Sequence, residues 1–129
     1  MTRASILSLL WVFLSLNFLW CDVFTLMHAP DLKEILTGEV GGVALSQTFL
    51  LAFAVVMELA LAMILVSRLA PHAPARVANI LVALLLTVIQ GGSLLVGGVS
   101  LHYVFFSVVE IATALSIIWL AVTWRAASP

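Results

Sequence analysis

The chain has 129 residues, of which 64% are hydrophobic and 9% charged, and its formal net charge at pH 7 is −1. Soluble domains have about 45–50% apolar and about 25% charged residues, so this composition predicts an integral membrane protein. The five Lys and Arg residues are scattered and form no basic run, which excludes a nucleic-acid partner.

Four apolar stretches are long enough to cross a bilayer, at about 4–27, 45–67, 77–96 and 101–124. An α-helix rises about 1.5 Å per residue, so about 20 apolar residues cross about 30 Å of hydrocarbon. The first stretch is expected to be retained, because its apolar run is longer than that of a signal peptide and no small-x-small cleavage site follows it. We therefore predict an all-α fold, a four-helix transmembrane bundle in a single domain covering residues 1–129.

The segments between the spans carry turn and helix signals. In the polar segment 28–44, Pro30 and Asp31 favour a helix start and Gly38 favours its end, which predicts a short interfacial helix. Pro71 and Pro74 prevent one continuous helix between the second and third stretches. Those two stretches are thus expected to fold back on each other as a hairpin.

The charges at the ends of the spans predict an orientation. Four arginines fall on one side of a four-span bundle, namely Arg3, Arg68, Arg76 and Arg125. The other side has a single lysine, Lys33, and three acidic residues, Asp31, Glu34 and Glu39. Cytoplasmic loops carry the excess of Lys and Arg. We expect a multi-pass protein of the plasma (inner) membrane with both termini in the cytoplasm and segment 28–44 outside.

A short sequence echo suggests two related halves. Residues 40–45 read VGGVAL and residues 96–101 read VGGVSL, each before a span that contains one glutamate. Applying this offset places Glu58 and Glu110 four residues apart, close to one helical turn, so both are expected to project from comparable faces. Two parallel-related hairpins are one interpretation, and chance similarity between apolar helices is the other.

Six polar residues lie in or near the spans and form the predicted site: Asn17, Asp22, Glu58, Gln90, His102 and Glu110. Counting along the helices places Glu58 nearest the middle of the membrane, with Glu110 closer to the outside. Ionisable residues at membrane depth usually face the bundle interior and serve function. An apolar surrounding disfavours a charge, so either glutamate is expected to be able to hold a proton near neutral pH. The alternative is that these groups join helices through hydrogen bonds.

No motif indicates a metal or a cofactor. The three histidines lie in loops or at span ends without a ligand-type partner four residues away, so no metal or haem site is expected. The one cysteine, Cys21, excludes an internal disulfide and leaves intermolecular pairing open.

The chain resembles a family of small, uncharacterised four-span membrane proteins, mostly bacterial. The resemblance covers most of the chain and rests on these features: Leu10-Trp11, Asn17 to Asp22, Glu58, Ser67-Arg68, Asn79-Ile80, Tyr103-x-Phe105-Phe106 and Glu110. It implies no established activity. More distantly, the four-span layout is similar to the DoxX-like group, a likeness at the level of fold.

Three functions fit these residues. The first is binding or transport of a small lipophilic or cationic ligand, with protonation of Glu58 and Glu110 coupled to its occupancy. The second is an accessory subunit of a larger membrane complex. The third is a membrane-embedded isomerase or cyclase, in which one carboxylic acid donates a proton and the other accepts one. The chain is too short to line a wide pathway alone, so a homo-oligomer is expected in addition to contact with the lipid bilayer.

Overall fold

The computed structural model describes residues 1–96 and 99–126. Its elements in chain order are α1 (Arg3–Met27), α2 (Ala29–Leu36), β1 (Glu39–Val40), β2 (Val43–Ala44), α3 (Gln47–Leu69), α4 (His72–Ser93) and α5 (Leu101–Val122). The helices α1, α3, α4 and α5 are long and apolar enough to cross a membrane. The predicted all-α class with four transmembrane helices is confirmed, and the protein is a membrane protein.

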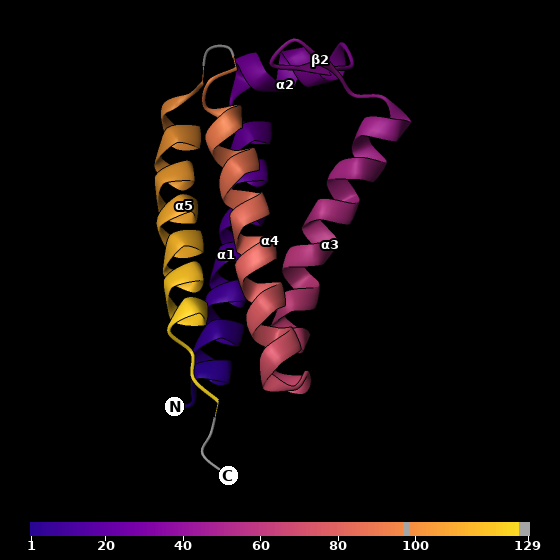
Figure 1. The fold of residues 1–129 in the computed structure, drawn as a ribbon. Coiled ribbons are helices and arrows are strands. Elements are labelled where there is room, and N and C mark those ends of the chain that lie inside the picture. Colours follow the sequence, from indigo (N-terminus) through magenta and orange to yellow (C-terminus); the bar gives the residue numbers. More distant parts are fainter. Residues whose placement is uncertain (97–98, 127–129) are drawn as a thin grey trace.

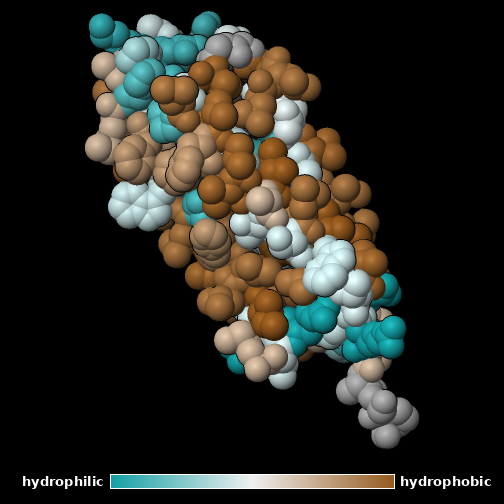
Figure 2. Space-filling view, turned by 90° about the vertical axis from the view of Figure 1, so that its left-hand side faces the viewer, coloured by the Kyte–Doolittle hydropathy of each residue, from teal (hydrophilic) through white to brown (hydrophobic). Residues whose placement is uncertain are grey.

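The four long helices run side by side, with both termini at the same end (Figure 1). Helix α1 contacts α3 and α5, and α4 contacts α5 and α3. We call the end with the termini the basic end, since it carries Arg3, Arg68, Arg76 and Arg125, and the other end, with Asp31, Glu34 and Glu39, the acidic end. Figure 2 shows polar residues gathered at the two ends and a broad apolar surface between them.

The acidic end is covered by α2 and a small hairpin. Helix α2 has Pro30 in its first turn, where a proline costs no intrahelical bond, and Gly38 follows it with a φ of 86°. Strands β1 and β2 pair antiparallel around Gly41 and Gly42, whose φ values of 57° and 81° suit a tight hairpin turn. The sequence predicts the helix, whereas the hairpin is not predicted. The glycine pair 97–98 in the second copy of the sequence echo lies outside the described residues.

The turn between α3 and α4 is shorter than expected. Helix α4 begins at His72, with Pro71 as its N-cap, whereas the sequence suggested a start near residue 77. Pro74 lies in the first turn of α4, where its missing N–H has no intrahelical partner to lose. Pro74 therefore prevents α3 and α4 from forming one continuous helix and is itself part of the first turn of α4.

The core lies between the middle of the bundle and the basic end. Trp11 of α1 is its largest side chain, and the facing helices contribute three alanines beside larger apolar residues. The core residues are Leu7, Trp11, Leu14, Ala60, Met63, Ala83, Leu86, Ala114 and Ile117. Alanines at these positions allow neighbouring backbones to approach closely, as is typical of membrane bundles.

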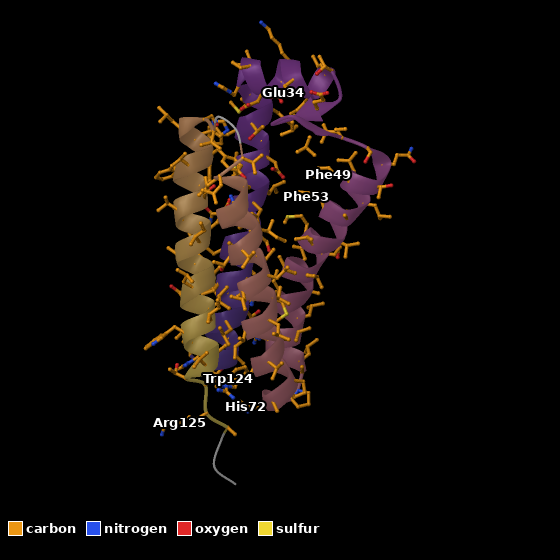
Figure 3. All side chains as sticks on the ribbon, turned by 45° about the horizontal axis from the view of Figure 1, so that its top comes forward. Glu34, Phe49, Phe53, His72, Trp124 and Arg125 are labelled. Atoms are coloured by element: carbon orange, nitrogen blue, oxygen red, sulfur yellow. The ribbon has the colours of Figure 1, made fainter. Side chains whose placement is uncertain are left out.

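Toward the acidic end, α3 diverges from the other three helices (Figure 1). Every residue from Ser46 to Val55 is exposed, meaning not covered by the chain itself. Phe49 and Phe53 lie on the side of α3 that faces the other helices (Figure 3), and their rings stack at 6.4 Å between centroids. Together with Val56, Ala60 and Met63 they form one stripe at three- and four-residue spacing along α3. Ala60 and Met63, nearer the basic end, are packed in the core. This stripe is therefore only half packed.

Candidate functional site

Glu110 lies on the inward face of α5. Ser107, Glu110, Ala114 and Ile117 follow one another at spacings of three and four residues, and all are buried. The Glu110 side chain is 2% exposed, and neither of its carboxyl oxygens has a hydrogen-bond partner among the described residues. An unpartnered buried polar group costs about 1–3 kcal/mol. Glu110 is thus the residue whose burial most needs a functional explanation.

Two residues of α1 lie near Glu110. Cys21 is 4% exposed, and its thiol and the Asp22 carboxyl are both close enough to interact electrostatically with Glu110. Helix α1 therefore brings a second carboxyl group to the site.

The Asp22 side chain lies on the side of α1 that faces α3. Ser8, Ser15 and Asp22 are seven residues apart, about two helical turns, and so share one side of the helix. Ser8 fixes that side, because its Oγ donates a 2.8 Å hydrogen bond to the Ile64 carbonyl of α3. Asp22 is exposed, whereas Ser8, on the same side of α1 but nearer the basic end, is buried. The site is therefore uncovered on its α3 side at the level of Asp22.

Two interhelical hydrogen bonds between polar side chains lie between Glu110 and the acidic end, and neither includes Glu110 itself. One turn from Glu110, the Gln90 amide donates a 2.6 Å hydrogen bond to the Ser107 hydroxyl, linking α4 to α5. One turn further, the hydroxyls of Ser93 and Tyr103 are 2.5 Å apart. Residues 103, 107 and 110 share one face of α5, so these polar side chains form a polar column from the acidic end to the middle of the bundle.

Two residues of the predicted site lie outside this cluster. The Asn17 amide donates 2.9 Å to the Phe13 carbonyl of its own helix. His102 lies at the acidic end, where its Nε2 is 3.2 Å from the Thr25 hydroxyl and its ring is 5.7 Å from that of His28.

Glu58 lies on the opposite side of α3 from the packed stripe. It is two residues from both Val56 and Ala60, which pack on the core, and at about 100° per residue it points away from the bundle. Its side chain is exposed. The expectation that Glu58 and Glu110 project from comparable faces is wrong for this structure, since only Glu110 faces inward. The predicted set that the structure does gather is Asp22, Gln90 and Glu110.

Sequence reasoning assigned no site role to Cys21, Ser93, Tyr103 or Ser107. The spacing of Tyr103, Ser107 and Glu110 could have indicated a polar face of this helix, because polar residues four and three positions apart in an apolar helix lie on one side. Ser15 was also overlooked; its buried hydroxyl has no partner among the described residues.

A second buried polar cluster, nearer the basic end, is internally satisfied. The Trp11 indole N–H donates 2.7 Å to the Asn79 side-chain oxygen, and the Asn79 amide donates 3.1 Å to the Ser67 hydroxyl and 2.8 Å to the Ala75 carbonyl. All three side chains are at most 1% exposed. This cluster joins α1, α3 and α4, and its satisfied hydrogen bonds indicate a structural role.

Within residues 1–96 and 99–126, no group of three or more His, Cys, Asp or Glu side chains is arranged to hold a metal ion. The family model described as "Family of unknown function (DUF6326)" matches residues 1–128 of the chain. No curated protein and no solved structure matches it. The family match agrees with the resemblance to an uncharacterised family, and nothing among the comparisons tests the likeness to the DoxX-like group or a bacterial source.

Proposed function

Because the chain belongs to the DUF6326 family, whose function is unknown, we propose from its own residues that it binds a small lipophilic cation at Glu110 and Asp22, as the binding step of a transport cycle. The observation that carries this proposal is the buried Glu110 carboxyl group without a hydrogen-bond partner among the described residues. Such a group is destabilising unless something with a donor or a positive charge reaches it. A cation with N–H groups supplies both.

The surroundings of Glu110 favour a lipophilic ligand. The rings of Phe24 and Phe106 lie 5.6 Å apart, on the side of the site nearer the acidic end. Phe49 and Phe53 of the diverged part of α3 face the other helices (Figure 3). Aromatic faces attract cations as well as apolar groups. The half-packed stripe of α3 would close on an apolar guest, and the two carboxyl groups would hold its charge.

Ethidium is a suitable probe, because it is a flat lipophilic cation with amino groups and its fluorescence reports binding. With the protein in nanodiscs, we expect Glu110→Gln to weaken ethidium binding about tenfold or more, since a hydrogen bond to a charged group contributes about 1.5–3 kcal/mol. The matched control is Glu58→Gln, which removes a carboxyl at similar membrane depth on the opposite side of α3. Equal affinities for the wild type and both variants, with unchanged oligomeric state, would refute the proposal.

We further propose a plasma-membrane location with the basic end in the cytoplasm. The support is the distribution of charge: four arginines at the basic end, against one lysine and three acidic residues at the acidic end. Lys33 is the single lysine of the chain, so endoproteinase Lys-C can cut only there. Cleavage in intact spheroplasts is the expected result. Cleavage only after lysis would contradict this orientation.

A second candidate function is assembly through the outward face of α3, and Glu58 favours it. Ionisable residues in membranes face protein or water, not lipid, yet the chain itself leaves Glu58 exposed. A second copy is the simplest cover, because the two facing Glu58 carboxyls can share one proton as a hydrogen bond. Glu58→Leu should then convert dimers to monomers in native mass spectrometry. A wild type that is monomeric in nanodiscs would exclude this assembly.

A further inference from the structure

The basic end contains a cavity of about 660 Å³ that the cation site does not explain. It is open to the surroundings and lies far from Glu110, where α3 ends, α4 begins and α5 ends. Figure 3 shows His72, Trp124 and Arg125 together at this end. The polar and aromatic residues that line it are Arg3, Ser67, Arg68, His72, Thr123, Trp124 and Arg125.

Three arginines from three different parts of the chain line this cavity. Arg3 belongs to α1, Arg68 to the last turn of α3, and Arg125 to the segment after α5. Among the described residues, the one ion pair is His28 with Asp31 at the acidic end, so no acidic side chain balances these arginines. Like charges gathered in one cavity repel each other, and an anion between them removes that repulsion.

The arginines of the basic end divide into two kinds. Arg76, outside the cavity, donates to the Ala121 and Val122 carbonyls at 3.0 and 2.9 Å, and Arg3 donates to the Leu120 carbonyl and the Thr123 hydroxyl at 2.6 and 2.9 Å. These bonds satisfy the last carbonyls of α5. The guanidinium groups of Arg68 and Arg125 make no hydrogen bond within the described part of the chain, which leaves their donors to a ligand.

The other side of the cavity is also suited to an anion. Helix α4 begins at His72, and its N-cap, Pro71, makes no side-chain hydrogen bond to the first turn. The free N–H groups at the start of a helix attract anions, and here His72 and Ala73 supply them, since Pro71 and Pro74 have no N–H. The His72 ring is held edge-on to Trp124 at 4.8 Å between centroids, and its Nε2 is 3.2 Å from the Trp124 carbonyl. The aromatic wall is thus fixed beside the arginines.

We propose that this cavity binds a phosphate group through Arg68 and Arg125, with Arg3 and the start of α4 completing its surroundings. Planar guanidinium groups match the oxygens of phosphate in pairs. Basic pockets at the ends of transmembrane helices are sites for anionic lipid headgroups, and Trp124 suits the depth of those headgroups. The phosphate belongs either to an anionic lipid or to a free phosphate ion.

The two sources are separated by two measurements on the full-length protein. Native mass spectrometry follows the retention of phosphatidylglycerol against phosphatidylcholine, and titration calorimetry in a neutral detergent follows inorganic phosphate. Arg68→Gln and Arg125→Gln are compared with Lys33→Gln, which removes a positive charge at the acidic end. Circular dichroism and size-exclusion chromatography check that each variant keeps its fold, as expected for exposed arginines without hydrogen bonds within the described residues.

We expect each arginine variant to weaken binding about fivefold, the change that corresponds to about 1 kcal/mol for one basic residue at an anionic surface. Preferential retention of phosphatidylglycerol that falls in the arginine variants alone identifies a lipid headgroup. Binding of inorganic phosphate that falls in the same variants identifies a free phosphate ion. If neither ligand binds, or if Lys33→Gln weakens binding as much as the arginine variants, the proposal is overturned.

Discussion

Asn79→Ala tests whether the buried cluster at the basic end holds three helices together. The substitution removes the acceptor of the Trp11 indole N–H at 2.7 Å and the donor to the Ser67 hydroxyl at 3.1 Å. Interhelical hydrogen bonds in membranes contribute about 0.6 kcal/mol on average and about 1.7 at most, so two of them contribute about 1–3 kcal/mol. The buried indole N–H left without an acceptor adds to this cost, which puts the expected loss at about 2–4 kcal/mol.

The assay is reversible unfolding in mixed micelles of a mild detergent and SDS, followed by tryptophan fluorescence. Asn17→Ala is the matched control, because Asn17 bonds only to the Phe13 carbonyl of its own helix and should lose less than about 1 kcal/mol. A double-mutant cycle with Trp11→Phe isolates the indole bond. If Asn79→Ala destabilises the protein no more than Asn17→Ala, the cluster does not hold the helices together and the reasoning fails.

Two further predictions use the same preparation. Glu110→Leu should raise the free energy of unfolding by about 1–3 kcal/mol while abolishing ethidium binding, because it replaces an unpartnered carboxyl with an apolar side chain; a destabilised variant would show that Glu110 is bonded in the protein. Arg76→Ala should speed amide hydrogen exchange in the last turn of α5 about fivefold, because it removes two donors to the carbonyls there. Arg68→Ala, which makes no such bond, is the control, and equal exchange in both variants would contradict the capping role.

The number and approximate extent of the long helices could be predicted because each is a long apolar run bounded by prolines, glycines or charges. Such runs identify a span without reference to any other part of the chain. The sequence predicts a start of α4 that is five residues too late, because Pro71 and Pro74 both favour a break between helices. Pro74 is instead accommodated in the first helical turn.

The direction in which Glu58 points could not be predicted. Depth along a helix follows from counting residues, but the side that faces the bundle follows from a contrast between apolar and polar faces. Helix α3 is apolar nearly all round, so its sequence offers no such contrast. The contact of Ser8 with Ile64 and the bond of Ser67 to Asn79 fix its orientation, and both depend on other helices. The same limit applies to the Trp11, Asn79 and Ser67 cluster, whose members come from three helices.

The two halves of α3 should respond differently to loss of a side chain. The basic half is fixed by Ser8 and Ser67, whereas in the diverged half Phe53 is 41% exposed. Replacing a well-packed phenylalanine with alanine costs about 3–5 kcal/mol.

For Phe53→Ala we expect a loss of less than about 1 kcal/mol without ligand, together with weaker ethidium binding, because this ring packs fully only against a guest. Phe105→Ala, on the outer side of α5 and 66% exposed, should change neither quantity. A loss of several kcal/mol in ligand-free Phe53→Ala would mean that α3 packs along its whole length in the membrane. Glu110 would then be closed off from that side, and a ligand would have to reach it along the polar column from the acidic end.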